Sequence, residues 1–173
     1  MAAMDSTDPS ARRARLRQYQ QQLLERMQAA RTSSGARAHQ LGVEIGGVRY
    51  LLDLLEAGEI VPVPALTRVP LTQAWYLGLA NIRGSLVGVV DLAHYFGQPA
   101  VPAAAPQGAA RIITLAPGLG VPCGLLAARV VGLRHAADMQ PDGQGLRDAD
   151  GLDWTPLPLA PLVREERFLH VGL

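Results

Sequence analysis

The sequence contains no lysine: all sixteen basic side chains among its 173 residues are arginine, set against fifteen acidic residues. Aromatic residues are also few, with two tryptophans, four tyrosines and two phenylalanines. Eighteen glycines and thirteen prolines accompany abundant valine, leucine and alanine. This composition favours short strands and turns over a helical bundle, in one domain or two small subdomains that share a core.

Cysteine and long apolar runs are scarce too. The single cysteine, Cys123, excludes an intramolecular disulfide framework and is typical of a reducing compartment. No apolar run approaches the roughly 20 residues of a membrane span. The first residues, "MAAMDSTDPS", carry acids where a signal peptide has a basic start. We therefore expect a cytoplasmic protein.

Positive charge is concentrated near the beginning. Residues 1–40 hold seven arginines against three acids, whereas the remainder holds nine arginines against twelve acids. A basic helix at residues 12–31 could follow nucleic-acid phosphates, so a nucleic-acid-binding double β-barrel is the alternative function. The overall charge of +1 and the few aromatic residues count against it.

Catalytic and metal-binding patterns are weak throughout. Cys123 lies in the apolar run "VPCGLL" with no candidate base beside it, which is typical of a buried thiol. No histidine has another ligand at a metal-binding spacing; the four are His39, His94, His135 and His170. Glu165 and Glu166 are expected to be solvated. The sequence predicts no enzyme, no metal and no cofactor.

An amphipathic helix is predicted over residues 9–31. Asp8 is placed as its N-cap and Pro9 at its first position. Apolar residues recur every three or four positions: Leu16, Tyr19, Leu23, Met27 and Ala30. The helix either packs on the domain that follows or forms an arm that docks on a partner. We expect residues 1–38 to be this arm and residues 39–173 to be the domain.

From Leu41 the apolar period changes to two. "LGVEI" and "VRYLL" flank Gly46-Gly47, which predicts a tight hairpin. "EIVPV" is a further extended piece, and Pro62 and Pro64 confine it to a sheet edge or a strand end. "WYLGLANI" and "SLVGVV" are strands on either side of Arg83-Gly84, and "DLAHYFG" is a short helical turn capped by Asp91.

The second half repeats this pattern after a Pro/Ala-rich linker at residues 98–110. "RIITL", "VPCGLL" and "RVVGL" are predicted strands, and the acidic segment 138–153 is predicted to be a surface loop. A short helix near residues 159–163 and a strand from Phe168 complete the chain. Short strands without long helices between them indicate antiparallel barrels, and the central linker indicates two.

Arg83 is unusual because it interrupts an apolar run. Burying it unpaired would cost several kcal/mol. It therefore lies at a turn with Gly84, pairs with Glu59 or Asp91, or is held for a partner. The two tryptophans could pack in the core or anchor a partner. For Trp75 both roles stay open, and Trp154 is expected in the core.

These segments carry a family resemblance. "VEIGGVRYLLDLLEAGEIVPVPALTRV" and "YLGLANIRGSLVGVVDLAHYFG" closely resemble the CheW-like domain of bacterial chemosensory systems. "RIITLAPGLGVPCGLLAARVVGLRHAADMQP" is similar to the family's second half, and the similarity becomes faint from Asp142. The N-terminal helix, "GEI", the tryptophan at position 75 and "RFLHVG" are similar to members in twitching-motility pathways. The matching residues are Tyr50, Glu59, Ile60, Thr67, Arg68, Gly78, Asn81, Ile82, Arg83, Gly84, Asp91 and Leu92.

The resemblance implies a mainly β, CheW-like fold of two intertwined five-stranded SH3-like barrels after an N-terminal helix. It implies a non-enzymatic adaptor of two-component signal transduction, which couples the tip of a methyl-accepting chemoreceptor to the regulatory domain of a CheA-like histidine kinase. The protein would work in the cytoplasm at membrane-associated receptor arrays, with type IV pilus twitching as output, and array or ring assembly is compatible with this role. The implied partner-binding residues are Arg83, Asn81 and Gly84, with Glu59, Ile60 and Gly78 near a receptor-facing or kinase-facing surface.

Some positions depart from the family pattern. Ile82 stands where leucine is usual, which is a harmless exchange by volume. Gly88 replaces a common proline, Ala57 a valine, and Ala128 an aspartate. The missing aspartate weakens the expectation that the second subdomain makes every contact made by its relatives.

Overall fold

The structure, a computed structural model, describes residues 17–24, 39–98 and 108–173. Residues 17–24 form a helix in which every residue is exposed, including Tyr19 and Leu23. The rest of the helix predicted over 9–31, and most of the linker predicted at 98–110, lie outside the described residues. Whether the helix packs on the domain or forms an arm stays a prediction.

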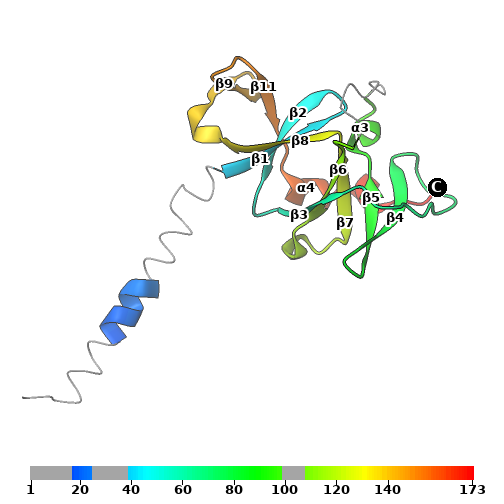
Figure 1. The fold of residues 1–173 in the computed structure, drawn as a ribbon, viewed down its shortest axis with the longest axis horizontal. Coiled ribbons are helices and arrows are strands. Elements are labelled where there is room, and N and C mark those ends of the chain that lie inside the picture. The colour runs from blue at the N-terminus through cyan, green and yellow to red at the C-terminus, as the bar shows by residue number, and fades with distance from the viewer. Residues whose placement is uncertain (1–16, 25–38, 99–107) are drawn as a thin grey trace, which may run out of the picture. The chain divides into compact units, whose positions relative to one another are not determined.

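The first sheet contains six strands in the order β8-β1-β2-β11-β10-β9 (Figure 1). Gly46 and Gly47 join β1 to β2 with φ angles of 59° and 81°, which confirms the predicted hairpin. The strands are β1 (His39–Ile45), β2 (Val48–Asp53), β8 (Arg129–His135), β9 (Gln140–Asp142), β10 (Gly145–Arg147) and β11 (Asp153–Pro156).

The second sheet contains five strands in the order β3-β6-β7-β5-β4. The 3₁₀ turn η1 (Pro117–Leu119) joins β6 to β7, and a second, η2 (Ala136–Asp138), follows β8. The strands are β3 (Ala57–Pro62), β4 (Tyr76–Ile82), β5 (Ser85–Val90), β6 (Arg111–Leu115) and β7 (Cys123–Ala127).

The chain enters the first sheet, builds the second with β3 to β7, and returns to the first at β8. The predicted mainly β fold with intertwined halves is thus confirmed. Two pairings differ from the expected antiparallel pattern, because β11 lies parallel to β2 and β7 lies parallel to β5. Each parallel pair places a strand of the second half of the chain beside one of the first half.

The segment 138–153 is not the predicted surface loop. It forms β9 and β10, which add the strands that make the first sheet six-stranded. Arg147 joins the neighbouring strands through ion pairs with Asp142 at 2.6 Å and Asp153 at 2.8 Å. Asp142 on β9 and Asp153 on β11, which we expected in a solvated loop, therefore lie on either side of Arg147 on β10.

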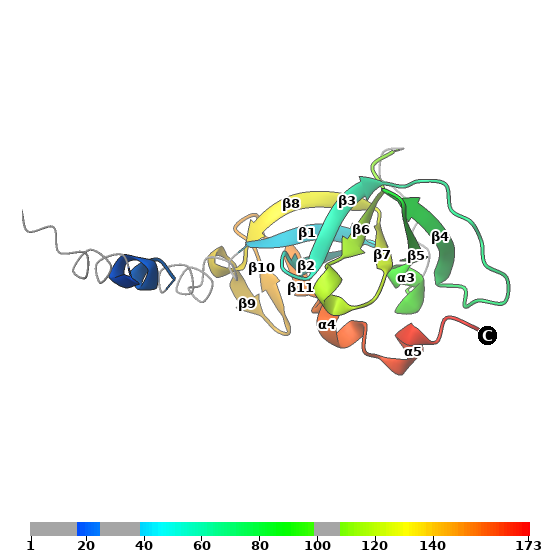
Figure 2. The same cartoon turned by 90° about the horizontal axis from the view of Figure 1, so that it is seen from below.

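Three short helices complete the fold: α3 (Leu92–Tyr95), α4 (Leu159–Leu162) and α5 (Glu166–Leu169). The Asp91 carboxylate accepts the Ala93 and His94 N–H groups, which confirms the predicted cap of α3. The strand predicted from Phe168 is wrong, since Phe168 belongs to α5. After α5, the chain forms an isolated β-bridge between Thr72 and Gly172, with further backbone hydrogen bonds on either side of it. Figure 2 shows α4 and α5 together below the sheets.

One hydrophobic core joins both sheets and the C-terminal helices. Val43 and Leu52 come from the first sheet, Ile113 and Leu125 from the second, and Leu159 from α4. All five are fully buried, so both sheets share the largest core cluster. Two smaller clusters belong to one sheet each: Ala80, Ile82, Val87, Val89 and Ile112 in the second sheet, and Leu51, Met139 and Trp154 at the first.

The tryptophans are both core residues, because Trp75 is 5% and Trp154 1% exposed. The start of α4 is capped by a residue distant in sequence. The Glu56 carboxylate accepts the Leu159 N–H at 2.7 Å and the Ala160 N–H at 3.2 Å. This carboxylate holds the start of α4 against the turn between β2 and β3, and no sequence motif links these two segments.

Candidate functional site

The turn between β4 and β5 places Arg83 outside the core. Arg83 and Gly84 have φ angles of 50° and 84°, the left-handed pair that a two-residue hairpin turn needs. The Gly84 N–H donates to the Asn81 side-chain oxygen at 2.9 Å. A non-glycine residue in this conformation is uncommon and carries backbone strain. The predicted turn position is confirmed, with the Arg83 side chain 76% exposed.

Arg83 forms an ion pair with Glu59 of β3. The Arg83 Nη1 and Glu59 Oε1 atoms are 3.2 Å apart, and the Glu59 side chain is 48% exposed. Asp91, the other candidate partner, instead caps α3 and lies 3.6 Å from His94 Nδ1. Solvent-exposed ion pairs contribute at most about 1 kcal/mol to stability. The pair therefore fixes the direction of two charges more than it stabilises the fold.

A bulge in β3 turns Glu59 toward Arg83. The register between β3 and β6 shifts between Ala57 and Ile60. Inside the bulge, the Glu59 N–H donates to Thr114 Oγ1 at 2.7 Å, and this hydroxyl donates to the Glu59 carbonyl at 3.4 Å. A bulge redirects side chains locally, and Thr114 replaces the lost ladder bonds. Sequence reasoning missed Thr114, which no motif marks.

An open pocket of about 630 Å³ lies beside this ion pair. Glu59 and Arg83 contribute its charged groups, and β3, the β4–β5 turn, β6 and the loop before β7 surround it. We call this the Arg83 pocket. Its apolar lining consists of Ile82, Val87, Leu115, Pro117, Val121 and Pro122.

Apolar surface bordered by fixed charges is the usual anatomy of a protein-binding surface. Ile60 follows Glu59 on β3 and is 44% exposed, but it does not line the Arg83 pocket. The structure therefore brings Asn81, Arg83, Gly84 and Glu59 together at the β4–β5 turn and leaves Ile60 beside them.

Gly78 is not part of this cluster. It lies toward the other end of β4 with φ at 131°, and a Cβ there would collide with the Thr67 carbonyl oxygen. The close approach allows two reciprocal backbone hydrogen bonds of 2.8 Å between Thr67 and Leu79. Glycine is therefore required at position 78 by the backbone conformation and by the close approach of Thr67.

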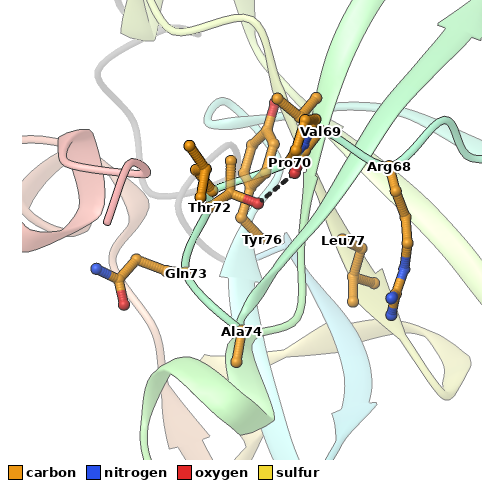
Figure 3. A pocket seen from close by; sticks show the side chains of 9 residues that line it. Arg68, Val69, Pro70, Thr72, Gln73, Ala74, Tyr76 and Leu77 are labelled. Atoms are coloured by element: carbon orange, nitrogen blue, oxygen red, sulfur yellow. Dashed lines mark hydrogen bonds between the residues drawn. The ribbon is translucent and has the colours of Figure 1, made fainter.

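A second pocket, of about 420 Å³, borders the segment after Thr67 (Figure 3). Thr72 Oγ1 donates to the Val69 carbonyl at 2.9 Å. Figure 3 shows Arg68 extending beside Leu77 while Gln73 points the other way, so their polar groups do not converge on one ligand position.

Cys123 and the histidines are the other side chains that sequence analysis considered for chemistry. Burial raises the pKa of the Cys123 thiol to about 12, which keeps it protonated at neutral pH. Within residues 17–24, 39–98 and 108–173, no group of three or more His, Cys, Asp or Glu residues could hold a metal ion. In that same part of the chain no helix is long and apolar enough to span a membrane. The pairing of β1 with β8 places the ring centroids of His39 and His135 4.2 Å apart. Their positions in the sequence did not predict this contact.

The fold and its turn motif correspond to a known family. Residues 39–153 match the model of the CheW-like domain, and the chain belongs to this family. Over 95 residues it is 30% identical to Protein PilI of Pseudomonas aeruginosa. That match covers 55% of this chain and 51% of PilI, so the chain spans about half the length of this relative.

A solved structure supports the fold. The scaffolding protein TtCheW from Thermoanaerobacter tengcongensis superposes with a TM-score of 0.56 at 21% identity. The superposition covers 71% of this chain and 91% of TtCheW. The two-sheet architecture is therefore shared with a scaffolding protein.

Proposed function

We propose that this protein is a non-enzymatic adaptor that couples a methyl-accepting chemoreceptor to a CheA-like histidine kinase. The observation that carries the proposal is the exposed Arg83–Glu59 ion pair at the Arg83 pocket, in a chain of the CheW-like family. An adaptor makes and breaks no covalent bond, so it needs oriented recognition groups on a rigid support.

The geometry supports such recognition. The left-handed turn holds the Arg83 backbone, Thr114 holds the Glu59 backbone, and the shared core supports both sheets. A preorganised surface loses little conformational entropy on binding. Oriented charges fix the register of a partner and exclude wrong partners more than they add affinity. The apolar lining would supply most of the buried surface.

The pathway and the location belong to the same proposal. Similarity to PilI supports a chemosensory system that controls type IV pilus twitching. The adaptor would work in the cytoplasm at receptor arrays beneath the membrane. Residues 1–38 would form an arm, and residues 39–173 the domain that binds receptor and kinase. Asn81, Gly84 and Ile60 would lie at the partner surfaces, and Gly78 would support them through the backbone of β4.

A three-component pull-down tests the proposal. The tagged full chain is mixed with the cytoplasmic fragment of the chemoreceptor and the CheA-like kinase encoded in the same genome. We expect both to be retained, and we expect the kinase to retain the receptor fragment only when the adaptor is present. If neither is retained while random-sequence DNA or RNA binds in a salt-dependent way, the adaptor function is wrong and the nucleic-acid alternative is favoured.

A further inference from the structure

A basic pocket of about 320 Å³ lies away from the Arg83 pocket and shares no lining residue with it. Three segments form it: the chain before β4, helix α3, and helix α5 with the residue after it. Its lining residues are Gln73, Ala74, Trp75, His94, Arg167 and His170. Three of these six carry a cationic or protonatable nitrogen side chain, and none carries a carboxylate.

Arg167 is held in place without a carboxylate partner. Its guanidinium carbon lies 4.4 Å from the centre of the Tyr95 ring, in a cation–π contact. None of the ion pairs among the described residues involves Arg167. Glu165, two residues before Arg167, is already engaged, since its Oε2 accepts the Tyr95 hydroxyl at 2.6 Å. The guanidinium is therefore oriented by a ring face while its N–H groups stay available.

The floor of the basic pocket is rigid. Trp75 packs edge-on against Tyr95 at 5.1 Å and nearly parallel to Phe168 at 6.1 Å. Although Trp75 is buried, its indole N–H makes no hydrogen bond to any residue that the structure describes. Aromatic packing of this kind fixes the position of the indole, so the N–H of this lining residue is held in one place.

The remaining polar groups leave further donors. His94 contacts Asp91 through Nδ1 at 3.6 Å, so its Nε2 is not used by that contact. The Asp91 carboxylate is also engaged in the cap of α3, where it accepts the Ala93 and His94 backbone N–H groups. The Gln73 amide uses one N–H to donate to the Gly172 carbonyl at 3.2 Å, and this bond leaves its second N–H unused. The His170 imidazole makes no hydrogen bond within the described part of the chain.

From this arrangement we infer that the basic pocket binds an oxyanion, either a carboxylate or a phosphate group. A guanidinium presents two parallel N–H groups that match two oxygens of such a ligand, and charge-assisted bonds of this kind are about twice as strong as neutral ones. The indole N–H adds a donor on a lining residue, the His170 imidazole can donate through one ring nitrogen, and His94 Nε2 donates when its ring is protonated. A cationic ligand is disfavoured, because Arg167 would repel it and no Asp or Glu lines the pocket.

The two tryptophans give a direct measurement on the full chain. In a ¹⁵N-labelled sample, the indole signal of Trp75 reports on the basic pocket. Trp154 is an internal reference, because its indole N–H donates to Asp148 at 2.8 Å in the other sheet. Sodium phosphate and a triglutamate peptide are titrated separately at pH 7, with sodium chloride keeping the ionic strength constant. We expect a saturable shift of the Trp75 signal and none of the Trp154 signal.

The two probes distinguish the source of the oxyanion. A shift with phosphate alone assigns a phosphate group, and a shift with the peptide alone assigns carboxylates. Arg167→Gln is expected to weaken the binding at least about tenfold. Arg164→Gln, at an exposed arginine outside the pocket lining, is expected to leave it unchanged.

The inference is overturned if neither probe moves the Trp75 signal, or if Arg167→Gln binds as tightly as the unaltered chain. His170→Ala is a second variant in case Arg167→Gln lowers the melting temperature, because His170 is exposed and makes no packing contact comparable to the ring contact of Arg167. It too should weaken binding without a change in fold.

Discussion

Arg83 and Glu59 meet 3.2 Å apart because two unusual backbone features face each other: a left-handed turn under Arg83 and a bulge under Glu59. Both side chains remain in contact with water, so the pair is accessible to a partner as it stands. An incoming carboxylate can compete for the guanidinium, and an incoming cation can compete for Glu59. This accessibility is the physical basis for assigning the pair to recognition.

Replacement of Arg83 separates recognition from stability. Arg83→Ala should change the free energy of unfolding by less than about 1 kcal/mol, because the ion pair is solvated. It should nevertheless weaken retention of receptor or kinase at least about tenfold. Chemical denaturation and a quantitative pull-down measure the two effects. Arg129→Ala is the matched control, since Arg129 forms a similar exposed pair with Glu44 at 3.3 Å. A chain unfolded by Arg83→Ala would contradict the recognition role.

Thr114 is predicted to act through Glu59. Thr114→Val keeps the shape of the side chain but removes the hydroxyl that supports the bulge, so partner affinity should fall and Glu59 should lose its fixed direction. Thr114→Ser keeps the hydroxyl and should retain affinity. Double-mutant cycles with Glu59→Gln measure the coupling between the two positions. Additive effects of the two changes would rule out this role for Thr114.

Gly78 is predicted to serve stability. Gly78→Ala should destabilise the protein by more than about 2 kcal/mol, because φ at 131° is unfavourable for alanine and the new methyl group would collide with Thr67. Gly118→Ala is the control, since nothing lies within 4 Å of the position of its Cβ. Thermal melting of both variants tests this. Equal melting temperatures would leave Gly78 with a role at a partner surface instead.

Cys123 is predicted to make stability depend on alkaline pH. Burial raises its pKa from 9.0 to about 12, so the folded protein keeps a proton that the unfolded chain releases. Stability is therefore present below pH 9 and falls as pH rises above it, by about 2 kcal/mol up to pH 10.5. Denaturation between pH 8 and 10.5 measures this slope, and Cys123→Ala should reduce it. At pH 7 the native thiol should react with a disulfide reagent far more slowly than the denatured thiol.

The N-terminal arm is predicted to be dispensable for folding. Deletion of residues 1–35 should leave a soluble domain with an unchanged far-UV spectrum in the β region and a cooperative melt. Loss of the basic arginines should also remove any salt-dependent retention on nucleic acid. An insoluble product would show instead that the amphipathic helix completes the core.

The sequence alone determined the local elements of this protein. Apolar alternation placed nearly every long strand, paired glycines placed the first hairpin, and Asp91 placed the cap of α3, because these signals act between neighbours in the chain. Arg83 was placed at a turn for the same reason.

Tertiary structure decided what each local element meets. The β3 bulge gave Arg83 its partner Glu59 instead of Asp91, and Thr114 became its support from a strand distant in sequence. The segment expected to be an acidic loop forms β9 and β10, because these strands pair with each other and with β11, and Leu146 packs against the cluster of Leu51, Met139 and Trp154. Phe168 belongs to α5, where its ring packs on Trp75 and Tyr95. These contacts form because the chain passes from the first sheet to the second and back. A local residue pattern cannot predict which distant side chains the shared core will bring together.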